Sequence, residues 1–510
     1  MIPVPRLSDL LQQISQHATT NGNALAVADE TRRVNYAELS SAVSSRAQGL
    51  RDAGIVRGDR IAVVAENSAD YLIAVLAIWM ADGVPVTIYS STSPSDLRAT
   101  LEDADPVLVY ADGKTEVLVR TAAGRMLPVA RLDGPQTTVA RSSTAAATPK
   151  HLRDDLGLIC YSSGTTARPK AIMLSADAIL NSAATFAELW HLTKKDVTLV
   201  CLPMAWLFGL TTSSVSTLVA GGAVVSLKRA NPELIAKSIT EFGVTFFPAV
   251  TTVITKLANH LDAIGGSESK ADSTLRLVIS GGEPRNEASF ARLRAHLGVP
   301  VHDNYCASEM QPLVTYDPVE DPEPHLGSAG KLVPRSELRI LNAAGDPVAQ
   351  GEVGEGFSRG PGIMLGYWND PEATAEALTE DGWYRTKDLL TVDEMGYVRV
   401  VGRASDMIIR GGSNVSPGEI EQHLRKHPKV ADIAVVGLPD PLYGEEIVAV
   451  IQPRADASVD AEELREFAKA GLSGFKVPTR YLSVSSLPHN ATGKINRKNV
   501  KQQLEEGLIS

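Results

Sequence analysis

The sequence predicts an α/β protein with layered α/β subdomains, a small β-rich subdomain and an α+β C-terminal domain. Up to about residue 130, and again from residue 197 to about 330, apolar stretches of strand length alternate with helical patterns. Such alternation is typical of a largely parallel sheet covered by helices. Between residues 331 and 400, short strand patterns are separated by turn signals at residues 342–346 and 380–382, which favours a β-rich unit.

The individual elements follow from residue spacing. Leu39, Val43, Ala47 and Leu50 recur at the spacing of a helix with one buried face. The same kind of analysis gives strands at residues 60–65, from 83, and at 158–160, 198–202, 223–227, 244–247, 276–280 and 301–304, and helices at residues 36–50, 71–80 and 175–190.

The domain boundary is placed after residue 402. Residues 1–402 form the large domain, of which about 331–402 are the β-rich subdomain, and residues 403–510 form the C-terminal domain. At the start of a helix in the C-terminal domain, Ser416 and Glu419 predict a capping box, with proline at the first helical position. Residues 134–150, rich in Ser, Thr and Ala, predict an exposed connection.

Composition excludes several classes of protein. The net charge of -11 argues against a nucleic acid or an anionic membrane surface as partner. The three cysteines, Cys160, Cys201 and Cys306, lack the spacing of a zinc site or a disulfide framework. The longest apolar run, residues 71–80, is half the length of a membrane-spanning helix, and the first 16 residues lack the apolar core of a secretory signal. We expect a cytoplasmic protein.

A hydroxyl-rich loop is the first candidate for chemistry. Residues 161–170 read YSSGTTARPK and follow a short apolar strand. Gly164 allows the backbone to approach a ligand, and backbone amides, hydroxyls and the Lys170 ammonium can all bind an anion. This composition suits a loop that holds a polyphosphate, although it is not a Walker A loop, because no Gly-Lys-Ser/Thr follows at the required spacing. Alone, the segment would equally suit a surface turn.

Two further segments follow predicted strand ends, where α/β sheets bind their ligands. Residues 304–309 read NYCASE and offer an aromatic face for a purine in Tyr305 and a carboxylate for Mg²⁺ in Glu309. By itself this hexapeptide would favour a loop with a packed tyrosine and a solvated glutamate. Residues 281–284, GGEP, would by themselves be a turn.

These motifs, with three more at residues 381–389, 402–421 and 487–497, resemble those of the adenylate-forming enzymes. That superfamily contains acyl-CoA synthetases, peptide-synthetase adenylation domains and luciferases, and the chain looks closest to aryl- and acyl-CoA ligases. Six motifs occur in the superfamily's order over nearly the whole chain. The resemblance implies a large adenylation domain followed by a hinged, mobile C-terminal lid domain.

The resemblance also implies the binding residues. ATP would be bound by Ser162, Ser163, Gly164, Thr165, Thr166, Gly281, Gly282, Glu283, Asn304, Tyr305, Cys306, Ser308, Asp388 and Arg403. Among them, Tyr305 would stack on adenine, and Asp388 would accept hydrogen bonds from the ribose hydroxyls. The catalytic residues would be Lys494, Glu309 and Lys170, with Glu309 as the ligand of Mg²⁺.

The same match implies a domain rotation that admits CoA. Ser405 occupies the hinge position, where Asp or Lys is usual, and Gly411 and Gly412 would line the pantetheine tunnel after the rotation. ATP, Mg²⁺ and, at the second step, CoA are therefore the expected ligands.

The acyl pocket would be formed by Trp206, Phe208, Gly281 and Cys306. Residues 202–209 read LPMAWLFG, with Trp206 in place of the family's histidine, and no aspartate follows in this stretch to hold an α-amino group. Trp206 and Cys306 add bulk, which favours a small or aromatic acid over a long fatty acid. The alternative is that neighbouring side chains retreat and restore the space.

The acceptor and the rate remain open at this point. Ala167, Ala171, Cys306 and Lys387 replace glycines of the family, which leaves their effect on catalysis undetermined. Besides CoA, a carrier protein or an amine could accept the acyl group, and activation of nitrite for diazotisation is the extreme form of this alternative. A catalytically inactive nucleotide-binding module is disfavoured, because the residues with implied catalytic and nucleotide-binding roles are retained. The chain could also form a homodimer.

Overall fold

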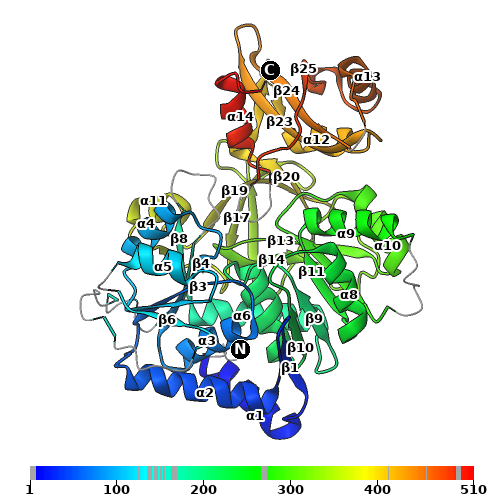
Figure 1. Cartoon of the computed structure of the whole chain (residues 1–510). Coiled ribbons are helices and arrows are strands. Elements are labelled where there is room, and N and C mark those ends of the chain that lie inside the picture. The colour runs from blue at the N-terminus through cyan, green and yellow to red at the C-terminus, as the bar shows by residue number, and fades with distance from the viewer. Residues whose placement is uncertain are drawn as a thin grey trace.

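The computed structural model contains a large N-terminal domain and a separate small C-terminal domain, which confirms the predicted α/β fold class. It describes residues 7–124, 127–134, 141, 142, 148, 149, 152, 155–161, 169–265, 273–411, 413–454, 457–489 and 495–509, without the side chains of residues 8, 9, 413 and 414. Figure 1 shows the C-terminal domain, orange to red, above the large domain. The exact boundary after residue 402 stays a prediction.

The first sheet of the large domain has seven strands. Their order across the sheet is β18 (Gly366–Tyr367), β8 (Ala171–Ser175), β7 (Leu156–Tyr161), β4 (Val84–Tyr89), β3 (Arg60–Ala65), β5 (Leu108–Ala111) and β6 (Val129–Arg131). The strands from β7 to β6 are parallel, whereas β8 and β18 are each antiparallel to their neighbour. The short β18 comes from far along the chain and places Tyr367 beside Ile172 of β8.

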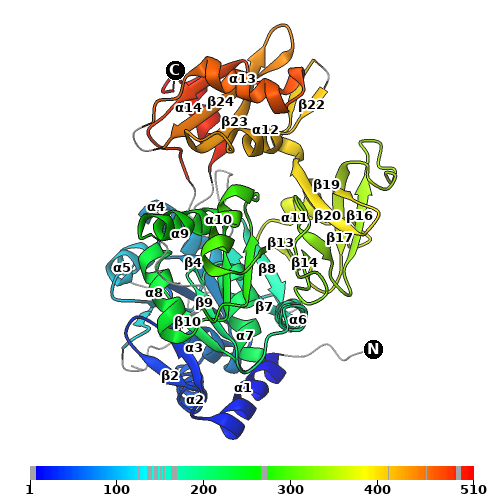
Figure 2. The same cartoon turned by 90° about the vertical axis from the view of Figure 1, so that its right-hand side faces the viewer.

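The second sheet has thirteen strands. They lie in the order β16 (Glu337–Leu341), β17 (Gly354–Arg359), β19 (Tyr384–Val392), β20 (Tyr397–Arg403), β15 (Gly330–Leu332), β14 (Met310–Thr315), β13 (Val301–Ala307), β12 (Leu277–Gly281), β11 (Phe246–Ala249), β9 (Val197–Val200), β10 (Ala223–Ser226), β1 (Leu25–Ala28) and β2 (Arg33–Asn35). The β-rich region from residue 330 is thus not a separate sheet, since β14 pairs with both β13 and β15. Figure 2 shows its outer strands, yellow-green, extending away from the α/β layers.

Helices cover and separate these two sheets. They are α1 (Leu7–Asn21), α2 (Tyr36–Asp52), α3 (Ala69–Met80), α4 (Pro94–Ala104), α5 (Glu116–Ala123), α6 (Ala176–Leu189), α7 (Ser216–Val219), α8 (Pro232–Phe242), α9 (Thr251–Ala263), α10 (Glu287–Leu297) and α11 (Pro371–Ala377). The predicted helices at residues 36–50, 71–80 and 175–190 correspond to α2, α3 and α6, and Ser175 caps α6 by accepting from the Ala178 amide. Because α6 contacts β7 and β14, it lies between the sheets.

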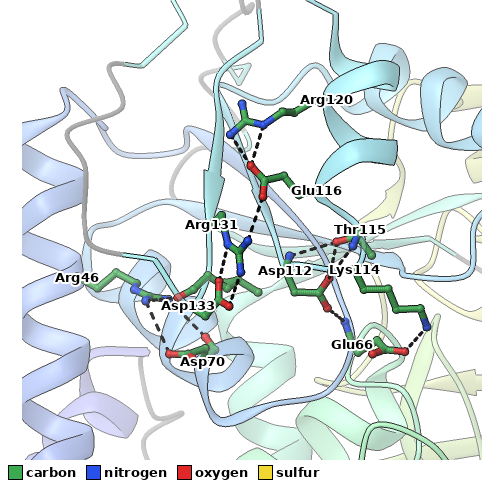
Figure 3. Close-up of polar contacts among 11 residues, drawn as sticks. Arg46, Glu66, Asp70, Asp112, Lys114, Thr115, Glu116, Arg120, Arg131 and Asp133 are labelled. Carbon is green, nitrogen blue, oxygen red and sulfur yellow. Dashed lines mark hydrogen bonds and ion pairs between the residues drawn. The ribbon is translucent and has the colours of Figure 1, made fainter.

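Charged side chains connect the β6 edge of the seven-stranded sheet to neighbouring helices (Figure 3). Glu116 of α5 accepts a hydrogen bond of 2.9 Å from Arg120 and one of 3.3 Å from Arg131, which also pairs with Asp133 at 2.6 Å. From α2, the buried Arg46 donates to the carbonyl of Leu132 at 2.6 Å. This edge is thereby tied to α5 and α2. The connection predicted at residues 134–150 falls largely outside the described residues.

The C-terminal domain is a small α+β unit. Its strands are β21 (Ile408–Arg410), β22 (Ser413–Val415), β23 (Val430–Asp440), β24 (Gly444–Pro453) and β25 (Arg480–Ser483), and its helices are α12 (Pro417–Leu424), α13 (Ala461–Gly471) and α14 (Arg497–Glu505). Ile420, Val435 and Leu464 are completely buried in its core. Across the whole described chain, every helix is too short or too polar to cross a membrane.

The capping box predicted at Ser416 is wrong. The Ser416 side chain makes no capping hydrogen bond to α12, although Pro417 is the first helical residue as predicted. Its hydroxyl instead donates to the carbonyl of Val401, 2.7 Å away in β20, while Glu419 accepts from Lys476 at 2.7 Å. Ser416 is buried against the end of the large domain, so a carbonyl acceptor from β20 replaces the local amide as its partner.

Candidate functional site

The two sheets meet where the predicted site residues gather. Tyr305 lies near the end of β13, and Glu309 lies in the tight connection from β13 to β14. Lys170 immediately precedes β8 of the other sheet, and Asp388 lies on β19. Residues of the seven-stranded sheet therefore face the hairpin of the thirteen-stranded one.

Tyr367 joins the predicted metal ligand to the predicted phosphate-binding lysine. Its hydroxyl donates to Oε1 of Glu309 at 2.9 Å, and Nζ of Lys170 lies 4.5 Å from the centroid of its ring. Burial and the neighbouring Glu309 both raise the pKa of Tyr367, so the hydroxyl remains a donor at neutral pH. The carboxylate and the ammonium thus contact one aromatic side chain.

A second cluster surrounds Asp388. Its carboxylate accepts from the Tyr305 hydroxyl at 2.6 Å and from Nε of Arg403 at 3.0 Å. Burial raises the pKa of Asp388, and the attraction of Arg403 and the hydrogen bond from Tyr305 oppose that shift. A carboxylate has about four lone-pair sites, so Asp388 retains acceptor capacity for the two hydroxyls of a ribose.

Lys387 replaces a family glycine. Its backbone has a conformation that glycine would adopt more easily. Its φ of 59° is in the left-handed region, which costs an L-residue roughly 1–2 kcal/mol. Its ammonium is paired with Glu376 of α11 at 2.6 Å. The replacement therefore preserves the turn that presents Asp388 and adds an ion pair to α11.

The Gly281–Glu283 loop is fastened to a helix. Gly282 has a φ of 77°, as expected of a glycine turn. The Glu283 carboxylate accepts from the backbone amide of Thr252 at 2.6 Å and from its hydroxyl at 3.1 Å, at the first turn of α9. A carboxylate there is favoured by the helix dipole. Glu283 therefore positions the loop predicted to line the adenine.

Most of the predicted acyl-pocket residues lie together. The rings of Trp206 and Phe208 are 5.5 Å apart at 87°. A Cβ on Gly281 would lie 3.2 Å from Phe208 Cε1 and 3.2 Å from Nδ2 of Asn304, its partner across β12 and β13. Asn304, predicted as a nucleotide residue, is thus adjacent to this group. Cys306 lies two positions further along β13.

A π-helix at the same place was not predicted from the sequence. Residues Phe208–Val215 form this wide helix, η1, and are all buried. The Ser213 hydroxyl donates to the Phe208 carbonyl at 2.6 Å and the Ser214 hydroxyl to the Gly209 carbonyl at 2.7 Å, each five residues back. π-helical turns occur frequently at functional sites. The signal that could have revealed it is a run of Thr and Ser inside a buried helix.

Tyr367 and Tyr384 were also missed. Each is 6% exposed, and burial raises the pKa of both, with Glu309 contributing to each shift. Tyr367 follows Gly366 in a stretch without helical or strand periodicity, and Tyr384 was seen only as part of a motif. Their role depends on long-range packing that no local pattern encodes.

The predicted hinge lies between two anchored residues. Ser405 is in the 3-10 turn η2 (Ala404–Asp406). Before the turn, Arg403 is held by the large-domain carboxylate described above. At its end, Asp406 pairs with Arg497 of α14 at 3.6 Å, inside the C-terminal domain. Gly411, with a φ of 58°, donates its amide to the Tyr443 carbonyl at 2.7 Å.

Family models match both domains. The model of the AMP-binding enzyme matches residues 14–368, and that of the AMP-binding enzyme C-terminal domain matches residues 419–494. The chain belongs to the AMP-binding enzyme family. The resemblance to adenylate-forming enzymes inferred from six motifs is thereby confirmed.

Relatives of this AMP-binding enzyme match it over nearly its full length. A feruloyl-CoA synthase from Amycolatopsis sp is 33% identical over 492 residues, which cover 96% of this chain and 97% of the relative. Among solved structures, ATP-bound MatB from Rhodopseudomonas palustris has a TM-score of 0.86 at 27% identity. The amide bond synthetase McbA from Marinactinospora thermotolerans has a TM-score of 0.84 at 27% identity. Both structural matches cover 97% of this chain and 99% of the other.

Some predicted residues of the AMP-binding enzyme lie outside the described residues. These are residues 162–168, which include Ser162, Ser163, Gly164, Thr165, Thr166 and Ala167, together with Gly412 and Lys494. Their assignments stay predictions, as do the roles of the residues described above. Ala171, which also replaces a family glycine, is the first residue of β8.

The residues present fit a Mg²⁺ ion that is shared with a nucleotide. Glu309 is partly exposed, and its Oε1 is held by Tyr367. No group of three His, Cys, Asp or Glu side chains with metal-binding geometry occurs within the described part of the chain. Mg²⁺ usually binds one or two carboxylates together with phosphate oxygens and water. A single carboxylate near a lysine that is predicted to bind phosphate matches that mode.

Proposed function

We propose that this AMP-binding enzyme activates a small or aromatic carboxylic acid as its acyl-adenylate and then transfers the acyl group to the thiol of CoA. The observation that carries this proposal is the pair of tyrosine-held carboxylates. Asp388, with Tyr305 and Arg403, suits a ribose, whereas Glu309, with Tyr367 and Lys170, suits a metal-bound polyphosphate. Tyr305 and Glu309 belong to the same hairpin, β13–β14, so the two clusters can bind opposite ends of one ATP molecule.

In the first step, a carboxylate oxygen of the acid bonds to the α-phosphorus of ATP as the bond to pyrophosphate breaks. Catalysis then consists of positioning and charge stabilisation. Tyr305 offers a face to adenine, Asp388 orients the ribose, and Lys170 stabilises negative charge on the phosphates. When bound, Mg²⁺ neutralises further phosphate charge. Lys494 is proposed to contact the acyl carboxylate and the bridging oxygen.

In the second step, the CoA sulfur bonds to the acyl carbon, the bond to AMP breaks, and the thiol proton passes to solvent. This step needs access for a long pantetheine arm. Rotation of the C-terminal domain about Ser405 would withdraw Lys494 and bring Gly411 to the acyl site. The anchors on either side of Ser405 support this pivot, because Arg403 is tied to one domain and Asp406 to the other.

The acid class is inferred from the aromatic wall of the acyl site. The edge-to-face rings of Trp206 and Phe208 place two aromatic side chains at this site, which suits an aryl or short acyl group. The feruloyl group in the name of the 33% identical relative agrees with this inference.

An amine is a second candidate acceptor. It is favoured by the likeness to an amide bond synthetase, whose TM-score of 0.84 nearly equals that of MatB. In that case the amine nitrogen, rather than sulfur, would take the acyl group from the same adenylate. A carrier-protein thiol would accept the acyl group in the same way as the thiol of CoA.

The test is ATP consumption with Mg²⁺ across benzoate, ferulate, butyrate, malonate, palmitate and nitrite, each with and without CoA or a primary amine. Mass spectrometry identifies the products. We expect AMP and an acyl-CoA from an aryl or short acid. Higher activity on palmitate than on benzoate or butyrate would contradict the acid class. If an amide forms equally fast without CoA, the acceptor is the amine and not the thiol of CoA.

A further inference from the structure

The position of Tyr367 is fixed from two sides. β18 pairs antiparallel with β8 and sets Tyr367 opposite Ile172. On the other side, the Tyr367 amide donates to the Thr374 hydroxyl of α11 at 2.9 Å. The preceding Gly366 has a φ of 137°, and a Cβ there would lie 2.7 Å from Thr374 Cγ2. The backbone therefore holds the side chain in one place.

Both functional groups of Tyr367 are used. The hydroxyl donates a hydrogen bond to Oε1 of Glu309, and the ring face contacts the Lys170 ammonium. The backbone of Glu309 is held as well, since its carbonyl accepts from the Met364 amide at 2.9 Å. No ion pair joins Lys170 and Glu309, although the structure describes both residues. A single tyrosine therefore lies between opposite charges that would otherwise attract each other.

We propose that Tyr367 is a positioning residue that keeps Glu309 and Lys170 apart and oriented for a metal–polyphosphate ligand. This inference rests on the proposed function of the site. A hydrogen bond to one carboxylate oxygen fixes the plane of the carboxylate and leaves Oε2 for the metal, as partners of metal ligands commonly do. The ring holds the ammonium by cation–π attraction. Without the ring, Lys170 would pair with Glu309 and neutralise both.

A tyrosine, a carboxylate and a lysine also meet elsewhere, without this separation. The Tyr397 hydroxyl donates to Asp321 at 2.5 Å, and Nζ of Lys331 lies 4.6 Å from the centroid of its ring. There, however, Lys331 also pairs directly with Asp321 at 3.1 Å. A tyrosine that contacts both charges therefore does not by itself separate them, so the separation at the candidate site depends on where β18 and α11 hold Tyr367. Tyr397 provides a matched control outside the candidate site.

The experiment compares Tyr367→Phe, Tyr367→Leu and Tyr397→Phe in the full chain. ATP binding is measured by calorimetry while Mg²⁺ is varied, and ATP–pyrophosphate exchange is measured in parallel. We expect Tyr367→Phe to raise the Mg²⁺ concentration for half-maximal ATP binding about 10-fold, with rescue by excess Mg²⁺ and an unchanged KM for the acid. Tyr367→Leu should also weaken ATP binding without Mg²⁺, and excess Mg²⁺ should not restore it.

The control separates positioning from stability. Tyr397→Phe should leave the Mg²⁺ midpoint unchanged, whatever its effect on Tm. If Tyr367→Phe changes only Tm and leaves that midpoint at the wild-type value, the inference is overturned. The titration does not depend on the identity of the acid, so this result stands even if no acid in the panel is adenylated. Wild-type chain that binds no ATP would overturn the proposed function as well.

Discussion

Arg403, the last residue of β20, donates from Nε to the carboxylate of Asp388, 3.0 Å away on β19. The two residues are opposite each other in the register of these strands. Arg403 is also only two positions before Ser405. The proposed ribose ligand and the start of the proposed hinge are therefore one unit, so rotation beyond Arg403 can leave the nucleotide site assembled.

The Asp388 carboxylate should control ATP affinity and its pH dependence. Hydrogen bonds to a charged group are worth about 1.5–3 kcal/mol, so Asp388→Asn should weaken ATP binding roughly 10- to 100-fold at pH 7.5. Because burial raises the pKa of Asp388, the folded protein protonates this group at a higher pH than an ordinary aspartate. Wild-type ATP affinity should thus fall on acidification before ordinary carboxylates titrate.

Calorimetry of ATP binding between pH 4.5 and 8 checks this prediction. The exposed Asp381, whose side chain is 65% accessible, provides the control variant Asp381→Asn. That control should retain both the affinity and the pH profile of the wild type. An Asp388→Asn variant with the same acid-sensitive profile as wild type would show that another group is responsible.

Loss of one partner of a buried ion pair should destabilise the C-terminal domain. Glu421 is completely buried, and Arg497 donates to both of its oxygens at 2.8 and 2.6 Å. Arg497→Met would leave that carboxylate without its main partner, which typically costs about 3–5 kcal/mol. The double variant Glu421→Leu/Arg497→Met removes the buried charge and should recover most of the loss.

Hydrogen exchange in the C-terminal domain measures these effects. Burial opposes ionisation of Glu421, but the attraction of Arg497 prevails and lowers the pKa of Glu421 below its ordinary value. Its contribution is therefore present above the ordinary pKa of glutamate and is lost as pH falls through the lowered value. A double variant no more stable than Arg497→Met would contradict the account.

The sequence predicted the elements and motifs that depend on local pattern. The buried helix at residues 71–80 and the cap at Ser175 were visible because apolar spacing and a single hydroxyl specify them. The capping box at Ser416 failed for the opposite reason. Its local signature was complete, but a carbonyl from Val401 is a partner that only the fold supplies.

Candidate site residues could be named from the sequence where a motif carries its own chemistry. Asp388 and Glu309 could be named from the sequence because their motifs contain carboxylates and resemble those of a known family. Tyr367 could not be, because its two-residue strand has no periodicity and acts on residues 58 and 197 positions away. The sequence also did not reveal that the β-rich strands join the large sheet. That connection depends on β14, which pairs with β13 on one side and β15 on the other.

Cys306 should be the cysteine that reacts with alkylating reagents. Cys160 and Cys201 are buried, and burial raises the pKa of Cys160 and raises that of Cys201 to about 12. Cys306 is partly exposed and follows Tyr305, the proposed adenine-stacking residue. Iodoacetamide at pH 8 should therefore modify Cys306, and ATP should protect it.

Peptide mass spectrometry after brief labelling tests this expectation. Cys306→Ala should take up almost no label while it retains ATP binding, because a methyl group is no bulkier than the thiol it replaces. Equal labelling with and without ATP would place Cys306 away from the bound nucleotide. Rapid labelling of Cys160 would show instead that the seven-stranded sheet opens readily.

Gly281→Ala should discriminate between acids of different width. The new Cβ would lie 3.1 Å from the Asn304 carbonyl and 3.2 Å from Phe208 Cε1, tighter than ordinary contact. Because Gly281 belongs to the strand β12, we expect the Phe208 ring rather than the backbone to yield, and to yield toward the space proposed for the acyl group. One added methyl in such a pocket changes kcat/KM about 10-fold or more. We expect this loss for benzoate and a much smaller one for butyrate.

Acid-dependent ATP–pyrophosphate exchange provides the measurement for both acids. Gly474→Ala is the matched control, because no atom lies within 4 Å of the Cβ that it would add. The control should leave the benzoate-to-butyrate ratio unchanged. An equal loss for both acids in Gly281→Ala, together with weaker ATP binding, would mean that Gly281 borders the nucleotide rather than the acyl group. A loss confined to benzoate would place the aromatic ring of the acid against Phe208.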